Sequence, residues 1–228
     1  MQVGSDRRGS EFVITVECLV DKQPVVAKNQ GNRPTCLAFA VTDLNRSFVD
    51  EDLGPEYFYR ATLSRIPGWK PGDGLQIPAA IEASQLGHPK EREYPYQADE
   101  PQVPLEALPE DLALHGRPIK FFAADVGHLI GSMQAMVPMG LALKLTLDFY
   151  QPVDGVIPFS PTVLPGAMMH AVVAVGLGYD EGSQPWFLIR NTWGEAWGLN
   201  GHAWISAAYI ESHAACAFGV EHGSSDSR

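Results

Sequence analysis

Apolar positions recur at helical spacing in the first half of the chain and in strand-length runs in the second half. After Cys36, apolar residues fall at 37, 40, 41, 44 and 48, which predicts a helix over about residues 37–50. Similar patterns predict helices over 55–65 and 77–87, with a Gly- and Pro-rich break at 67–74. Strands are expected at 119–123, 140–147, 170–177, 186–190 and 202–206, and a short helix at 128–137 before Pro138. Helices first and strands second predict an α+β fold.

A stretch rich in proline and acidic residues, 97–118, is typical of a surface connection between the two halves. The sequence therefore predicts one domain over residues 13–228, with a helical part at about 30–115 and a strand-rich part at about 116–228. Gly9-Ser10-Glu11-Phe12 is typical of a cloning scar. Residues 1–12 are accordingly expected to be a tag or a disordered leader.

Length and charge narrow the class of protein. A chain of 228 residues can bury a large core, and its net charge of −11 argues against nucleic acid or an anionic membrane as a partner. The longest apolar stretches, at 136–147 and 166–179, are too short or too interrupted to span a bilayer. No apolar run follows Asp6-Arg7-Arg8, so no signal peptide is predicted; a trimmed leader is the alternative.

The cysteine content favours a reducing compartment. The chain has only Cys18, Cys36 and Cys216, too few for the disulfide framework of a small secreted protein, so a cytoplasmic location is expected. A Cys18–Cys216 bridge and a secreted or exported origin form the alternative. Neither Cys-x-x-Cys nor His-Glu-x-x-His occurs, so the sequence predicts no metal site and no cofactor.

Four separated positions fit the roles of acyl-transfer chemistry. Pro34 and Thr35 suit a helix start, which places Cys36 in the first turn, where a helix N-terminus and a nearby imidazolium lower a thiol pKa. His170 would exchange the thiol proton and protonate the leaving amine. Asn191 would bond the other ring nitrogen and fix the tautomer. The Gln30 amide and the Cys36 backbone N–H would form the oxyanion hole.

Each of these residues also has a structural interpretation. A lone buried cysteine is usually an inert small hydrophobe. His170 has the apolar surroundings of a core histidine, and Asn191 would suit a turn after a strand. The occurrence of all four residues in this order favours catalysis over those separate interpretations.

The same residues stand in longer segments that resemble the papain-like cysteine peptidases over roughly residues 24–221. Lys28-Asn29-Gln30-Gly31 resembles the oxyanion segment, Cys36-Leu37-Ala38-Phe39 the nucleophile helix, and Tyr94-Pro95-Tyr96 a family landmark. His170-Ala171-Val172-Val173 resembles the histidine strand, and Arg190-Asn191-Thr192-Trp193-Gly194 the asparagine segment. The resemblance implies a papain-like two-lobed fold, in which an N-terminal helical lobe faces a C-terminal antiparallel β-barrel lobe across the active-site cleft.

The resemblance also implies roles for residues around the catalytic groups. Trp193 would shield the Asn191–His170 hydrogen bond, and Trp197 would line the leaving-group side. The substrate pocket would be built from Gly74, Leu75, Gln76, Met168, Ala171 and Glu221. An apolar wall would favour Leu, Val or Phe, and Glu221 would pair with Arg or Lys, unless it belongs to a solvated tail.

This chain departs from the family pattern next to the nucleophile. Where the family usually has Cys-Gly-Ser-Cys-Trp, this chain has Arg33-Pro34-Thr35-Cys36-Leu37, so the neighbouring structural cysteine and the aromatic residue are both replaced. Met169 stands before the histidine, where many members carry Asp or Asn. No catalytic group is lost through these changes.

The sequence thus predicts a thiol-dependent peptidase that acts through an acyl-enzyme on a peptide or protein substrate. Two alternatives stay open: an acyltransferase or isopeptidase with the same Cys-His-Asn groups, and an inactive binding module. A regulatory domain or partner outside this chain is a further expectation.

Overall fold

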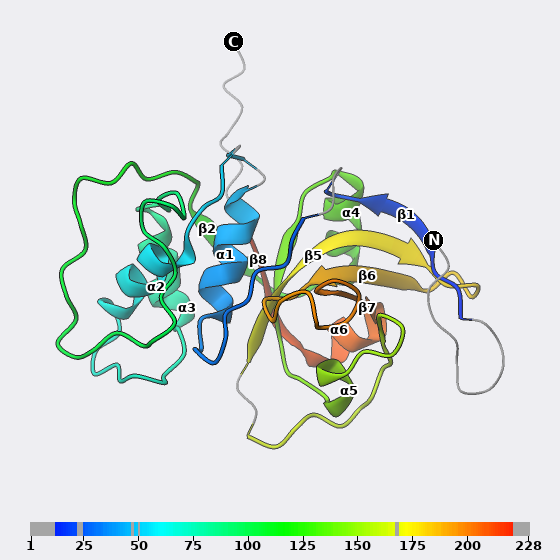
Figure 1. Ribbon diagram of the computed structural model, residues 1–228. Helices are drawn as coiled ribbons and strands as arrows, with labels where there is room; N and C mark the ends of the chain where they lie inside the picture. Colours follow the sequence, from blue (N-terminus) through cyan, green and yellow to red (C-terminus); the bar gives the residue numbers. More distant parts are fainter. Residues whose placement is uncertain (1–11, 22–24, 47, 50, 167–168, 221–228) are drawn as a thin grey trace, which may run out of the picture. The chain divides into compact units, whose positions relative to one another are not determined.

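The computed structural model describes residues 12–21, 25–46, 48–49, 51–166 and 169–220. The chain divides into two compact units, one of residues 1–30 and 122–217 and the other of residues 31–121 and 218–228. Figure 1 shows the helices and strands in order along the chain. The helical segments of the first half and the strands of the second half confirm the α+β class predicted from the sequence.

The first unit is built on an antiparallel sheet around one long buried strand. Strand β5 (His170–Tyr179) is paired along one edge by β6 (Pro185–Arg190), which in turn pairs with β7 (His202–Ser206). Along its other edge β3 (Met139–Leu143) covers the first half and β1 (Thr15–Leu19) the second half. Strand β8 (Ala214–Val220) lies beside β3, and β4 (Val156–Ile157) runs parallel to β7.

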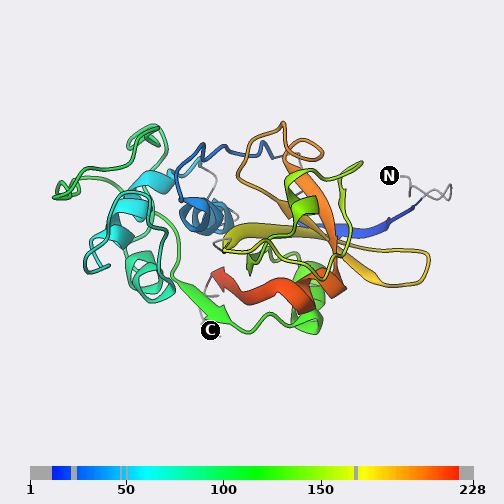
Figure 2. The same ribbon diagram turned by 90° about the horizontal axis from the view of Figure 1, so that it is seen from below.

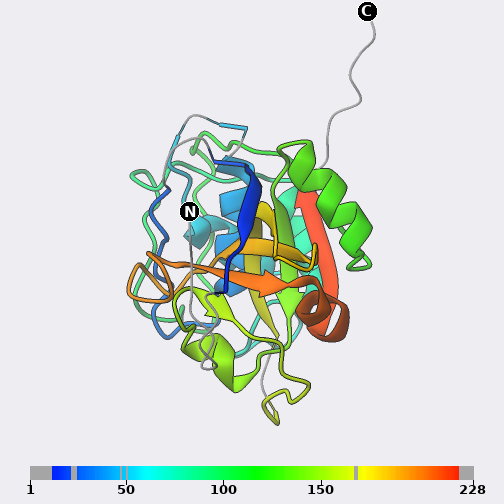
Figure 3. The same ribbon diagram turned by 90° about the vertical axis from the view of Figure 1, so that its right-hand side faces the viewer.

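Helices α4 (Val126–Gln134), α5 (Leu147–Tyr150) and α6 (Ala207–His213) complete the described part of the first unit, and its core lies mainly on one face of the sheet. Helices α4 and α6 lie on the same side of the strands, as Figures 2 and 3 show. The short α5 contributes Phe149 to the core cluster, beside Leu141 and Val172. A smaller cluster of Ile14, Trp186 and Trp204 covers part of the sheet elsewhere.

In the second unit, as far as the structure describes it, helices pack against one another in chain order. Helix α1 (Cys36–Arg46) contacts α2 (Pro55–Leu63), and α2 contacts α3 (Ile77–Ser84). Each helix buries an apolar face, because α1 turns Leu37, Ala40, Val41 and Leu44 inward at helical spacing. Strand β2 (Ile119–Phe122) lies beside β8, where the rings of Phe121 and Phe218 stack with centroids 4.9 Å apart.

The predicted strand at 140–147 is the clearest correction. Strand β3 ends at Leu143, and the apolar residues Leu147 and Phe149 belong to α5, where Phe149 is fully buried. An apolar run alone does not distinguish a strand from the buried face of a short helix. Strands β1, β4 and β8 and helix α6 were not predicted from the sequence.

Candidate active site

His170 and Asn191 meet because two neighbouring antiparallel strands place them at the same end of the sheet. His170 opens β5, and Asn191 directly follows the last residue of β6, which pairs with Val173. The His170 Nε2 atom lies 2.7 Å from Asn191 Oδ1, and both side chains are buried. The sequence predicted this pair from residue types and order and from the family resemblance, and the strand register gives its physical cause.

The hydrogen bonds of Asn191 fix the protonation state of the histidine ring. The Thr192 backbone N–H donates to Asn191 Oδ1 at 2.8 Å, so this atom is the amide oxygen, an acceptor. His170 Nε2 must therefore carry a hydrogen to donate to the same oxygen. In a neutral imidazole, the other nitrogen, Nδ1, is then unprotonated and can accept a proton.

Burial keeps the histidine ring neutral. It lowers the pKa of His170 to about 4, while the hydrogen bond with Asn191 acts in the opposite direction. Around neutral pH this ring is consequently a base with one lone pair available on Nδ1.

Aromatic rings surround the His170–Asn191 pair. The ring of Trp193 lies 4.6 Å from that of His170, and the Phe149 ring approaches the imidazole edge-on at 5.9 Å. Tyr150 stacks on Trp193 at 5.2 Å, and Trp197 donates its indole N–H to the carbonyl oxygen of Phe149 at 2.9 Å. This aromatic cluster keeps the imidazole in an apolar environment. The sequence had suggested Trp193 and Trp197 but not Phe149 or Tyr150.

The Gln30 segment is paired to the residues that follow Asn191. The Gln30 backbone N–H donates to the Thr192 carbonyl at 2.8 Å, and Gly194 N–H donates to the Lys28 carbonyl at 3.1 Å. The Thr192 hydroxyl also donates to Gln30 Oε1 at 2.5 Å, which fixes the orientation of the side-chain amide. Thr192 thus connects Gln30 with Asn191, a role that was not predicted from the sequence.

Cys36 lies in the second unit, as the first residue of α1, which confirms its predicted place in the first helical turn. The Phe39 N–H donates to the Thr35 carbonyl at 3.1 Å, so Thr35 directly precedes the helix. Cys36 is partly exposed, whereas Thr35 is fully buried. The position suits a thiolate, because backbone N–H groups at a helix start favour negative charge.

The residues proposed for substrate binding are distributed over both units. Gly74, Leu75 and Gln76 form the partly exposed or exposed approach to α3 in the second unit. Ala171 is buried in β5, opposite Ala142, and Trp197 belongs to the core of the first unit. Met168 and Glu221 lie outside the described residues. Their roles in substrate binding stay predictions.

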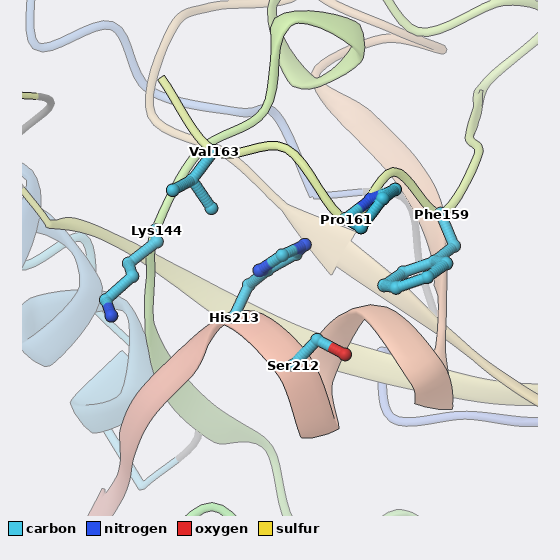
Figure 4. Close-up of a pocket in the computed structure, with 6 residues that line it drawn as sticks. All are labelled: Lys144, Phe159, Pro161, Val163, Ser212 and His213. Atoms are coloured by element: carbon cyan, nitrogen blue, oxygen red, sulfur yellow. The ribbon is translucent and has the colours of Figure 1, made fainter. Parts of the chain in front are cut away.

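The first unit also contains a cavity that is lined by none of the residues named above. It has a volume of about 300 Å³ and is lined by Lys144, Phe159, Pro161, Val163, Ser212 and His213. Figure 4 shows the His213 ring between Phe159 and Val163. His213 is held there by a hydrogen-bond contact of Nε2 with the Ser160 carbonyl at 2.7 Å.

Among the described residues, no group of three or more His, Cys, Asp or Glu side chains could hold a metal ion. The described residues also include no helix long and apolar enough to cross a membrane. All three cysteines are described, and none of them forms a disulfide.

Comparison with known sequences finds a family match. The family described as "Papain family cysteine protease" matches residues 72–221 of this chain. The matched range contains His170 and Asn191, whereas Gln30 and Cys36 precede it.

Curated relatives are similar over parts of their length. A cathepsin L-like proteinase of Fasciola hepatica is 28% identical over 182 residues, which cover 77% of this chain and 54% of the relative. Pro-cathepsin H of Bos taurus is 33% identical over 92 residues, covering 36% of this chain and 27% of the relative. The matched part is thus about half of the first relative and a smaller share of the second.

Solved structures share the fold at low sequence identity. Digestive procathepsin L3 from the larval midgut of Tenebrio molitor matches with a TM-score of 0.69 and 19% identity, covering 91% of this chain and 75% of that one. Xylellain, a cysteine protease from Xylella fastidiosa, matches with a TM-score of 0.69 and 18% identity, covering 92% and 87%.

Proposed function

The chain belongs to the papain family of cysteine proteases, and we propose that it hydrolyses peptide bonds with Cys36, His170 and Asn191 as its catalytic groups. Membership confirms the resemblance predicted from the sequence. One observation carries the mechanism: Asn191 Oδ1 accepts hydrogen bonds from both the Thr192 backbone N–H and the N–H at His170 Nε2. It leaves Nδ1 of a neutral, buried imidazole as the basic atom.

In the first half-reaction, His170 Nδ1 takes the proton of the Cys36 thiol, and the thiolate attacks the carbonyl carbon of the substrate. The resulting oxyanion accepts hydrogen bonds from the Gln30 side-chain amide and the Cys36 backbone N–H. The carbon–nitrogen bond then breaks, and the imidazolium gives its proton to the leaving amine. The product is a thioester between Cys36 and the acyl part of the substrate.

In the second half-reaction, water attacks the thioester while His170 takes one of its protons. The carbon–sulfur bond breaks, and the thiolate takes the proton held by His170, which restores the thiol and the neutral imidazole. The product leaves as the acid and loses its remaining proton to solvent as the carboxylate. No cofactor takes part in this scheme. Asn191 keeps the imidazole in one orientation throughout, because the Thr192 N–H bond holds the amide in place.

The architecture proposed with this mechanism has two lobes. A helical lobe of about residues 30–115 would supply Cys36, and a β-barrel lobe of about residues 116–228 would supply His170 and Asn191. The support for this pairing is the order of the motifs along the chain together with family membership.

The direct test compares the Cys36→Ala variant with the wild type on a fluorogenic peptide, with circular dichroism to verify folding. We expect turnover to vanish in the variant while its spectrum is unchanged. Appreciable peptidase activity in the folded variant would refute the mechanism.

Acyl transfer to an amine is the second candidate, because the same thioester serves both reactions. Mass spectrometry of products formed from a peptide in the presence of a competing amine distinguishes the two. Hydrolysis predicts mainly the free carboxylate, and a transferase would yield the amide of the added amine.

A further inference from the structure

The segment that leads into the Cys36 helix carries a charge that the proposed mechanism does not use. Arg33 is only 3% exposed, and its partner Glu56, on α2, is fully buried. Arg33 Nη1 donates to Glu56 Oε2 at 2.7 Å and to the carbonyl oxygen of Gln97 at 2.6 Å. Buried charges are costly unless they are paired and hydrogen-bonded, so these contacts fix the guanidinium in one place.

Aromatic rings hold the same guanidinium from its faces. Its central carbon lies 4.8 Å from the ring centroids of both Tyr59 and Tyr96. Glu100 approaches Nε at 3.6 Å and accepts a hydrogen bond from the Tyr59 hydroxyl at 2.9 Å. Arg33 thus joins α2 to the segment after the Tyr94-Pro95-Tyr96 turn.

The same cluster reaches the residue that directly precedes the nucleophile. The Thr35 hydroxyl lies 2.9 Å from the Tyr96 hydroxyl, within hydrogen-bond distance, and the Thr35 N–H donates to the Arg33 carbonyl at 2.8 Å. Residues 33 and 35 are therefore anchored on either side of Pro34, and Cys36 is the next residue.

We propose that Arg33 is a positioning residue for Cys36, which sets the thiol through this buried cluster of Glu56, Tyr59, Tyr96 and Glu100. Arg33 stands where the family pattern usually has a structural cysteine, and in the second unit Cys36 is the only cysteine. In this chain the Arg33–Glu56 ion pair, with the guanidinium between two tyrosine rings, therefore holds the nucleophile segment in place. A reductant cannot break such a link.

The inference rests on the proposed function only for its activity readout. Its primary readout is the second-order rate of Cys36 alkylation by iodoacetamide between pH 4 and 9, followed by mass spectrometry of the Cys36 peptide. Activity on a fluorogenic peptide supplies kcat and KM separately. If the proposed mechanism were wrong, the Cys36→Ala variant would still turn over substrate. The alkylation rate would remain interpretable, because it reports on the Cys36 thiol and not on turnover.

The test variant is Arg33→Met, which keeps the length of the side chain but removes its charge and hydrogen bonds. We expect alkylation and kcat to fall roughly 10- to 100-fold with KM changed less than about twofold, because small displacements of a reacting group are costly. Arg33→Lys should recover only part of the loss, since an ammonium lacks the planar fork. The pH midpoint of alkylation should move in Arg33→Met.

Arg60→Met is the matched control. Arg60 Nε also donates to Glu56, at 2.8 Å. Unlike Arg33, however, Arg60 lies on the same helix as Glu56 and does not belong to the segment that precedes Cys36. We expect this variant to lose thermal stability while its alkylation profile and kcat stay within about twofold of the wild type. An equal loss in both variants would mean that the cluster only stabilises the fold, and would overturn the proposal.

Should Arg33→Met not fold, the double variant Arg33→Met/Glu56→Leu replaces the buried pair by apolar side chains, a change that buried ion pairs often tolerate. It still lacks the bond to the Gln97 carbonyl. Slow alkylation and low kcat in the folded double variant would support positioning by Arg33. Wild-type values for both would contradict it.

Discussion

At the scale of single residues, Thr192 is the position whose role was not predicted from the sequence. Its N–H orients Asn191, and its hydroxyl orients Gln30. The hydroxyl bond has no signature in the sequence, because it depends on the pairing of segments 28–30 and 192–194. The N–H bond is local, since it joins two consecutive residues. Cys36, His170 and Asn191 could be picked out beforehand, since their residue types and order are themselves chemical evidence.

Thr192→Val removes the hydroxyl that holds Gln30 but keeps the shape and the backbone N–H. We expect kcat to fall by about tenfold with little change in KM, because the oxyanion donor is then less well oriented. Thr192→Ser, which keeps the hydroxyl, is the control and should stay near wild type. Equal activity of the two variants would show that the Gln30 bond is unimportant for turnover.

Gln30→Ala removes the donor itself. The expected loss in kcat is roughly 10- to 10³-fold, the usual range for one oxyanion-hole donor. Steady-state kinetics on a peptide reporter gives the answer. A change confined to KM would assign Gln30 to substrate binding instead.

Two buried histidines make the stability of the fold sensitive to acid. Burial lowers the pKa of His88 to about 3 and that of His170 to about 4, against about 6.5 in an unfolded chain. The folded state therefore binds fewer protons than the unfolded one below pH 6.5. The free energy of unfolding that depends on these two neutral rings is fully present above pH 6.5. It is lost progressively as the pH falls towards 4 for His170 and towards 3 for His88.

Urea unfolding at pH 7, 6 and 5 measures this effect. The free energy of unfolding should decrease steadily from pH 7 to 5, and His88→Phe should reduce that decrease. If the free energy of unfolding of His88→Phe fell with pH as steeply as that of the wild type, the proposed effect of buried His88 would be contradicted.

At the scale of elements, the centres of the segments were predictable and their ends were not. The predicted helix at 128–137 is α4, which starts earlier, at Val126, because the Asp125 side chain accepts a bond from the His128 N–H. That cap is visible in the sequence as an Asp before an apolar run. Strand β1 has no such signal, since its neighbour β5 is far away in the chain.

The loop between β6 and β7 depends on a glycine. Gly201 has φ +80°, its carbonyl accepts the Asn191 N–H at 2.9 Å, and a Cβ there would lie 2.1 Å from Ala27 Cβ. Gly201→Ala should cost roughly 2 kcal/mol or more in unfolding free energy and lower activity, because the loop that holds Asn191 must move. Gly68→Ala, at φ +71° with no atom nearby, isolates the backbone cost and should lose about 1 kcal/mol. Similar losses in both would contradict the steric argument.

At the scale of the whole molecule, the three cysteines carry no bridge. Titration of thiols under denaturing, non-reducing conditions should find three per chain, and adding a reductant should leave the melting temperature unchanged. A result of one thiol would instead indicate a Cys18–Cys216 bridge and support a secreted origin.

Family membership connects these scales. The sequence predicted the family from short segments, and the match over residues 72–221 together with the shared fold agrees with it. The nucleophile segment lies before that match and departs from the family pattern at Arg33, Pro34 and Leu37. The assignment of Cys36 is therefore the claim on which the account depends most.

Mapping the adduct of an epoxysuccinyl thiol-protease inhibitor tests that claim most directly. The protein is inactivated with one equivalent of inhibitor, digested and analysed by mass spectrometry, with Cys18 and Cys216 as internal references. The account predicts one adduct per chain, on the peptide that contains Cys36, and loss of activity in proportion to labelling. An adduct on Cys18 or Cys216, or full peptidase activity in a chain labelled at Cys36, would contradict it.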